Sequence, residues 1–215
     1  MAHIHLSDGS FTLPWAMFWW VCALFVLGGA LILFRRRRGG AYELKAIALA
    51  SFLTAALFAI FQLEIPVLGG IHLNLTPFVG ILAGPVMGCL VLFIVNILSA
   101  AVGHGGWSLI GANLLVNFTE LGTAYIIWRW MRDLALNVAI RGGAAAFMAL
   151  LLGNFVMIAI IMISGVQGQV VEFGELLLVG IGNLVAAVVE SIVTGLILAY
   201  ILKARPDLLD APARR

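Results

Sequence analysis

Charged residues are scarce in this chain. Only 10% of its 215 residues are Asp, Glu, Lys or Arg, whereas 63% are hydrophobic. Ordinary soluble domains carry about 25% charged and about 45–50% apolar residues, and even a domain of about 150 residues buries only about 70% of its chain's surface. A soluble protein of this length could not bury so much apolar surface. The composition therefore excludes soluble enzymes, nucleic-acid-binding proteins and disordered chains, and it indicates a polytopic membrane protein.

Other features are also missing. The chain has two cysteines, Cys22 and Cys89, and both lie inside apolar runs, so neither a disulfide framework nor a thiolate metal site is indicated. There is no Gly-x-x-x-x-Gly-Lys-Ser/Thr run, so the chain hydrolyses no ATP by itself. The apolar stretches are continuous and lack the alternation of a transmembrane β-barrel. We therefore expect an all-α membrane protein that is not an enzyme.

Five stretches are long enough to cross a bilayer, whose apolar core of about 30 Å needs roughly 20 apolar residues per helix. A further apolar stretch, residues 73–102, is interrupted at Gly84-Pro85. Proline removes a backbone donor and disfavours helix in the residue before it, so this stretch is one kinked helix or two short helices folded back. The five predicted continuous spans are Leu13–Phe34, Leu44–Leu63, Leu109–Trp128, Gly142–Ser164 and Leu176–Leu202.

The positions of the cations decide between these alternatives. If the stretch 73–102 is a hairpin, all twelve Lys and Arg residues lie on one side of the membrane, and if it is one span they do not. Positive charge collects on the cytoplasmic side, so the sequence predicts seven transmembrane helices with the N-terminus outside and the C-terminus inside. We expect a single domain over 1–215, with an outward peptide at 1–12 and a cytoplasmic tail at 206–215. The cation clusters are Arg35–Arg38 with Lys45, Arg129 and Arg132 with Arg141, Lys203 with Arg205, and Arg214 with Arg215.

The four histidines, His3, His5, His72 and His104, all fall outside or at the outer ends of the predicted spans. A histidine near the chain start offers a metal ion its imidazole, its backbone nitrogen and the free α-amine, a nitrogen set that suits Ni(II), Cu(II) and Co(II). If Met1 is removed, the amine of Ala2 and two nitrogens of His3 occupy three positions of a square plane around the metal. The fourth position is then left for His72. If Met1 is retained, its amine and the nitrogens of Ala2 and His3 fill the plane, and His72 is axial or unused. For any single histidine, exposure to water alone is the competing interpretation.

These residues resemble the CbiM/NikM family, the cobalt- and nickel-binding S components of energy-coupling factor (ECF) transporters. The resemblance covers nearly the whole chain and implies an extra N-terminal helix added to a six-helix core. It also implies Ni²⁺ or Co²⁺ as the transported substrate and no organic cofactor. The segments that carry it are His3-Ile4-His5-Leu6-Ser7-Asp8-Gly9, the loop of His72, the break at Gly84-Pro85, and Gly103–Asn113 followed by Asn117.

The resemblance further implies the site and the partners. The metal ligands are expected among Met1, Ala2, His3 and His72, and the residues beside them are His5, Asp8, His104 and Asn113. In this family the S component works at the cytoplasmic membrane with a transmembrane coupling (T) subunit and two ABC ATPase subunits. The resemblance also allows a small accessory membrane subunit. The stripe Ala46-xxx-Ala50-xxx-Thr54 then docks the T subunit, whereas internal packing is the other interpretation.

Polar residues inside the spans invite two interpretations. Asn113, Asn117 and Glu120 share one helical face, as do Asn183 and Glu190. Asn96 and Asn154 lie within other predicted spans. Helix–helix hydrogen bonding is the favoured interpretation, and a proton or cation relay is the alternative.

Two other functions stay open. A vitamin-type S component would need an aromatic outer pocket, for which Trp107 is the candidate. An intramembrane metalloprotein would need ligands on facing helices, yet no histidine lies in the middle of a predicted span.

Overall fold

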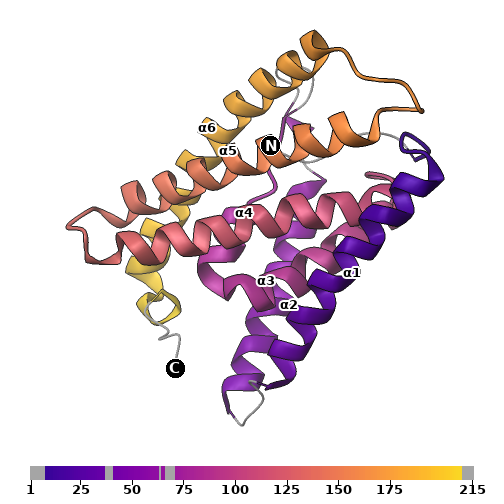
Figure 1. Ribbon diagram of the computed structural model, residues 1–215. Helices are drawn as coiled ribbons and strands as arrows, with labels where there is room; N and C mark the ends of the chain where they lie inside the picture. Colours follow the sequence, from indigo (N-terminus) through magenta and orange to yellow (C-terminus); the bar gives the residue numbers. More distant parts are fainter. Residues whose placement is uncertain (1–7, 37–40, 63, 66–70, 210–215) are drawn as a thin grey trace.

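The computed structural model describes all residues except 1–7, 37–40, 63, 66–70 and 210–215. Six long helices make up the described fold, which confirms the all-α prediction (Figure 1). Two short antiparallel strands, β1 and β2, lie between the second and third helices and pair Glu64 with His72. The elements are α1 Leu13–Arg36, α2 Ala41–Phe61, β1 Glu64–Ile65, β2 Ile71–His72, α3 Thr76–Ala101, η1 Trp107–Leu109, α4 Ile110–Trp130, η2 Met131–Asp133, α5 Val138–Ser164, α6 Phe173–Ala204 and η3 Pro206–Leu208.

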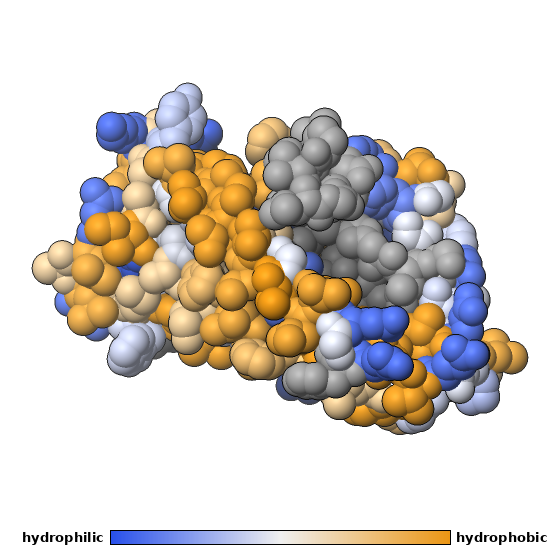
Figure 2. All heavy atoms as spheres, turned by 90° about the horizontal axis from the view of Figure 1, so that it is seen from above, coloured by the Kyte–Doolittle hydropathy of each residue, from blue (hydrophilic) through white to orange (hydrophobic). Residues whose placement is uncertain are grey.

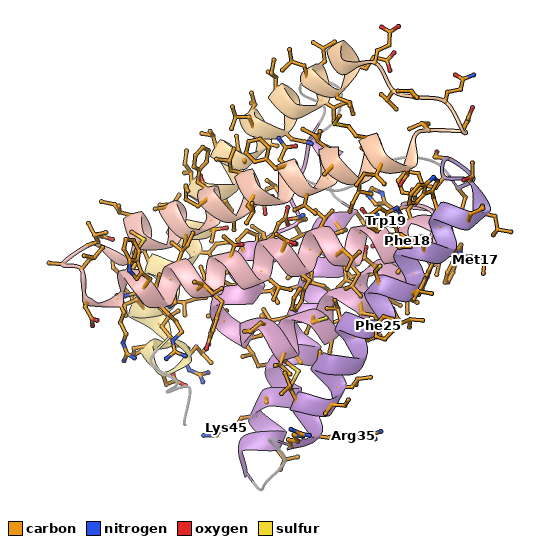
Figure 3. The ribbon with its side chains drawn as sticks, in the orientation of Figure 1. Met17, Phe18, Trp19, Phe25, Arg35 and Lys45 are labelled. Atoms are coloured by element: carbon orange, nitrogen blue, oxygen red, sulfur yellow. The ribbon has the colours of Figure 1, made fainter. Side chains whose placement is uncertain are left out.

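Five of the helices, α1, α2, α3, α5 and α6, are long and apolar enough to cross a membrane. Lipid offers no hydrogen-bonding partner, so a spanning segment must satisfy its backbone internally, as a helix does. Many large apolar side chains face outward: Met17 and Phe25 on α1 are 59% and 78% exposed (Figure 3). Apolar residues also cover much of the face seen from above (Figure 2). The chain is a multi-pass membrane protein.

Helix α4 lies at the centre of the described bundle. It packs against α1, α3 and α5, and most of its first three turns are buried. Its buried polar residues, Asn113, Asn117 and Glu120, follow one face of the helix toward the middle of the bundle. The most polar helix is therefore the one that its neighbours shield from lipid.

Helix α3 is broken at Gly84, where φ is 71° and ψ is 174°. A Cβ built on Gly88 would lie only 3.3 Å from Cγ1 of Val79. These two residues would stand about 13 Å apart along the axis of a continuous helix. The two arms of α3 are thus folded against each other, which favours the folded-back alternative. The first arm, Thr76–Ala83, is only about 12 Å long, shorter than the apolar core of a bilayer, and the count of seven transmembrane helices stays a prediction.

The ends of the helices sort into two groups (Figure 1). The end of α1, the start of α2, the α4–α5 connection and the end of α6 lie toward the lower left, whereas the start of α1 and the α5–α6 connection lie toward the upper right. All Lys and Arg residues of the described segments belong to the lower-left group, and Figure 3 labels Arg35 and Lys45 there. The described cations therefore gather at one end of the bundle, as the sequence predicts.

The contact of α3 with α4 depends on a glycine. A Cβ on Gly80 would lie 2.8 Å from Cα of Leu121, and backbone cannot move aside as a side chain would. We expect Gly80→Ala to destabilise the fold by about 1–3 kcal/mol and to lower the thermal unfolding temperature in detergent. The adjacent Gly122 has nothing within 4 Å of a Cβ, so Gly122→Ala is the matched control and should not lower that temperature. Equal unfolding temperatures for the two variants would contradict the close approach.

Candidate metal site

The predicted ligands lie mostly outside the described residues. Met1, Ala2, His3 and the neighbouring His5 belong to the segment 1–7, which the structure does not describe, and for His72 it describes the backbone alone, in β2. In the described part of the chain, no group of three or more His, Cys, Asp or Glu side chains lies together. The nitrogen ligand set therefore stays a proposal, and the described residues show only its surroundings.

Asp8, the first described residue, is held at the start of α4. Its carboxylate accepts hydrogen bonds from the Ser108 hydroxyl at 2.7 Å, the Ser108 N–H at 2.8 Å and the Trp107 N–H at 3.0 Å. These bonds, with that from the Ser108 hydroxyl first, hold the pKa of the Asp8 carboxyl below its usual range. Asp8 thus satisfies N–H groups of η1 that have no partner within the helix, as a capping residue does. Its expected place beside the metal stays a prediction, and its described contact anchors the segment that follows the N-terminal peptide.

The residues after Asp8 are fixed on their other side as well. The Ser10 carbonyl accepts a hydrogen bond from the Gln167 N–H at 2.6 Å, and Phe11 is buried. Helix α1 is tied to the same region, because Trp20 Nε1–H donates to the Trp107 carbonyl at 3.1 Å. The N-terminal peptide therefore leaves from a fixed point between η1 and the α5–α6 loop. A fully extended chain of seven residues spans at most about 25 Å.

The other two residues expected beside the metal lie around η1. The His104 N–H donates to the Ser99 carbonyl at 2.8 Å in the turn after α3, and the residue is half-buried. Asn113 is 2% exposed in the first turn of α4. The structure thus brings Asp8 together with the segment Gly106–Ser108, and Asn113 follows further along the chain in the first turn of α4.

A polar group that the sequence analysis missed lies two residues after His72. The Asn74 N–H donates to Oε2 of Glu190 at 3.3 Å, and the Thr76 N–H donates to Oδ1 of Asn74 at 3.1 Å. Leu75 between them has a φ of 49°, a left-handed conformation that is rare for a leucine. The available signal was the run Asn74-Leu75-Thr76-Pro77, with polar residues directly before a helix-starting proline.

The interpretation of intramembrane polar residues as helix–helix hydrogen bonds is confirmed at one place. Asn183 Nδ2 on α6 donates to Oδ1 of Asn154 on α5 at 3.1 Å, and Asn154 Nδ2 donates to the Gly180 carbonyl at 3.3 Å. Asn96 instead donates to the Leu92 carbonyl within its own helix. Glu120 is different, because neither of its carboxylate oxygens has a hydrogen-bond partner within the described structure.

Comparison with known proteins decides the family. Residues 5–208 match the family model described as the cobalt uptake substrate-specific transmembrane region, CbiM. The chain belongs to the CbiM family. A putative cobalt transport protein CbiM 1 of Methanosarcina barkeri is 26% identical, over 96% of this chain and 92% of the relative. A putative fused nickel transport protein NikMN of Archaeoglobus fulgidus is 27% identical, over 98% of this chain and 69% of the relative.

The fold is shared with a solved structure. A truncated transition metal transporter superposes with a TM-score of 0.81 over 94% of this chain and 99% of the other, at 18% sequence identity. The chain is therefore a multi-pass membrane protein of a metal-transport family. The family match starts at His5, so Met1, Ala2 and His3 precede it.

Proposed function

We propose that this protein captures Ni²⁺ or Co²⁺ outside the cell and takes it up across the cytoplasmic membrane as the S component of an ECF transporter. The observation that carries the proposal is the CbiM match over residues 5–208. The names of the relatives include both cobalt and nickel transport, which agrees with a nitrogen ligand set that serves either metal. Metal ions are the transported substrate here, and no organic cofactor is invoked.

The proposed ligands are the amine of Met1 or Ala2, nitrogens of His3, and the imidazole of His72. The anchored Asp8 supports this set, because it fixes the point from which the N-terminal peptide leaves the bundle. The His72 backbone supports it as well, since β2 leads directly to Asn74, which contacts Glu190 among the helices. His5, Asp8, His104 and Asn113 are proposed to surround the ligands without binding the metal.

The proposed partners are a T subunit and two ABC ATPase subunits, since the chain carries no phosphate-binding loop of its own. The side chains of Ala46, Ala50 and Thr54 on α2 are only partly buried, so packing within this chain leaves part of their surface exposed. Ala50 and Thr54 also line a groove of about 570 Å³ that continues to Met87 on α3. This surface of small residues supports docking of a T subunit there.

A vitamin-type S component is less well supported. Trp107, the candidate for an aromatic outer pocket, donates its backbone N–H to Asp8 and accepts from Trp20 through its carbonyl. These bonds give the segment a structural role. An intramembrane metalloprotein would need ligands on facing helices, and the described residues hold no group of three or more His, Cys, Asp or Glu.

The metal site is tested by the metal content of purified protein. We expect the wild type, tagged at the C-terminus, to hold about one Ni²⁺ or Co²⁺, because the ligand set is complete. His72→Ala and a permanent extension before Met1 should each lower the content sharply, since one removes a ligand and the other turns the amine into an amide. His104→Ala and His5→Ala are the matched controls and should keep the metal.

Two outcomes would contradict this site. Full metal content in the extended protein would exclude the amine as a ligand, and loss of metal in His5→Ala with retention in His3→Ala would move the site to His5. In cells, we expect accumulation of radioactive Co²⁺ only when the T and ATPase subunits are expressed together with this chain. Accumulation with this chain alone would contradict the ECF assignment.

The proposed orientation has the N-terminus outside and seven transmembrane helices, with the two arms of α3 counted separately. The grouping of the described cations at one end of the bundle supports it, because such charges collect on the cytoplasmic side. In a background without Cys22 and Cys89, we expect Glu172→Cys to react with an impermeant maleimide in intact cells. Arg36→Cys and Arg132→Cys should stay unlabelled until the cells are opened. Labelling of Arg132→Cys but not Arg36→Cys would contradict the folded-back arms as two crossings.

A further inference from the structure

Two glutamates, Glu120 on α4 and Glu190 on α6, are completely buried in the bundle, with 0% of each residue exposed. Their carboxyl groups lie close enough for their charges to interact. In the described part of the chain, no Lys or Arg side chain forms an ion pair with either of them. Carboxyl groups inside a membrane bundle are costly and rare, and they usually serve a function and face a group of opposite charge.

The positive charge that acts on both carboxyl groups is that of the chain's own amino terminus. Attraction between charges that do not touch is strong where lipid and apolar side chains keep water away, because such surroundings screen it little. The amine at the chain start is also a proposed ligand of the metal. The two glutamates therefore attract a group that the proposed metal site requires.

The loop of His72 leads to the same two carboxyl groups. The Asn74 N–H, two residues after His72, donates to Oε2 of Glu190 at 3.3 Å. The side chains of Asn74 and Thr76 present their donor groups to the Glu120 carboxyl, and the Thr76 N–H donates to Oδ1 of Asn74 at 3.1 Å. The two proposed sources of nitrogen ligands, the chain start and His72, thus both connect to the glutamate pair.

The carboxyl group of Glu120 is held in place by the packing of α4 on α5. A Cβ built on Gly153 of α5 would lie 2.9 Å from Cδ of Glu120, so the carboxyl group lies directly against the backbone of α5. A larger residue at position 153 would force that carboxyl group to move. The fold therefore keeps a space for this negative charge between two helices.

We propose that Glu120 and Glu190 provide the counter-charge of the metal site and position two of its ligands. Their negative charges draw the free amino terminus into the bundle, and Glu190 holds the turn that follows His72. Amine and imidazole ligands are neutral when they bind, so the same two charges also offset the positive charge of the divalent ion. The carboxyl groups are positioning residues that act through the amine and His72 and do not bind the metal. This inference rests on the proposed function, because it concerns the same site.

The first test measures the amine itself in metal-free, full-length protein in detergent. The lysines of the chain, Lys45 and Lys203, are exposed and serve as internal references. Near neutral pH an ordinary α-amine reacts faster than a lysine with a water-soluble succinimidyl ester, because less of it is protonated. We expect the opposite here, with the α-amine about tenfold slower than either lysine by peptide mass spectrometry, because the carboxylates keep it inside the bundle.

The variants of the first test separate charge from shape. Glu120→Gln and Glu190→Gln keep the size of the side chain but remove its charge. Each should therefore speed acylation of the α-amine severalfold, leave the rates of the two lysines unchanged, and unfold at the temperature of the wild type. Glu120→Asp and Glu190→Asp keep the charge and should restore most of the protection. Glu175→Gln, which changes an exposed glutamate on α6, is the matched control and should react like the wild type.

The second test measures the affinity of the same proteins for Ni²⁺. Each glutamine variant should bind Ni²⁺ about 10- to 100-fold more weakly, which is the usual cost of losing a group that supports a metal ligand. The aspartate variants should recover most of the affinity, and Glu175→Gln should bind normally. Equal affinity in the wild type and both glutamine variants would overturn the role of the pair as counter-charge.

The outcomes distinguish this inference from the proposed function. A wild-type α-amine that reacts as fast as the lysines would overturn the inference, and this measurement needs no variant, so it decides even if a glutamine variant fails to fold. Unchanged amine reactivity in both glutamine variants would overturn it as well, even with loss of metal. Faster acylation in those variants, together with a wild type that binds no Ni²⁺, would contradict the proposed function and support the attraction of the amino terminus to the glutamates.

Discussion

A bilayer supplies no water to the groups that it surrounds, so every polar group of this protein must find its partner within the chain or bind an ion. Helices satisfy the hydrogen bonds of the backbone, and the polar side chains of the spans gather where neighbouring helices exclude lipid. Helix α4 carries most of them, and it lies between α1, α3 and α5. The same constraint makes the two fully buried glutamates, Glu120 and Glu190, the most unusual polar residues in the bundle, because carboxyl groups inside a membrane are costly and rare.

The outer end of the bundle depends on contacts between distant parts of the chain. Asp8 caps η1, the Ser10 carbonyl accepts from the α5–α6 loop, and Trp19 Nε1–H donates to the Ser164 hydroxyl at 2.7 Å. These contacts hold the chain from Asp8 to Trp19 against the start of α4, the end of α5 and the loop that follows α5. A metal site built from the first residues of a chain needs such an anchor, since a free terminus would lose much conformational entropy on binding. The anchor is thus the structural counterpart of the proposed chelate.

The sequence predicted the long helices well, because their apolar length is a local property. The predicted span Leu13–Phe34 became α1 Leu13–Arg36, and Gly142–Ser164 became α5 Val138–Ser164, which begins about one turn earlier and includes Arg141. The break at Gly84 was predicted as well, but the sequence could not tell that the arms pack together. That packing depends on Gly80 and Gly88 meeting residues of other segments.

The surroundings of the site were harder to predict. The contact of Asp8 with Ser108 joins residues that no local pattern relates. Asn74 and Thr76 were missed for the same reason, since only the folded chain brings them to Glu120 and Glu190. Hydrogen bonding between helices was the right interpretation for Asn154 and Asn183, where two amides satisfy each other. It does not describe Glu120, whose oxygens have no such partner in the described structure.

The central claim is that a transition metal is held by nitrogen ligands from the chain start and His72. X-ray absorption spectroscopy on protein loaded with one equivalent of Ni²⁺ tests it most directly, because it reports the number and kind of atoms around the ion. The account predicts a four-coordinate nitrogen shell with the outer scattering of imidazole, as expected for square-planar Ni(II). A six-coordinate oxygen shell without imidazole scattering would contradict it, and would mean that the first ion bound goes to carboxylates and water.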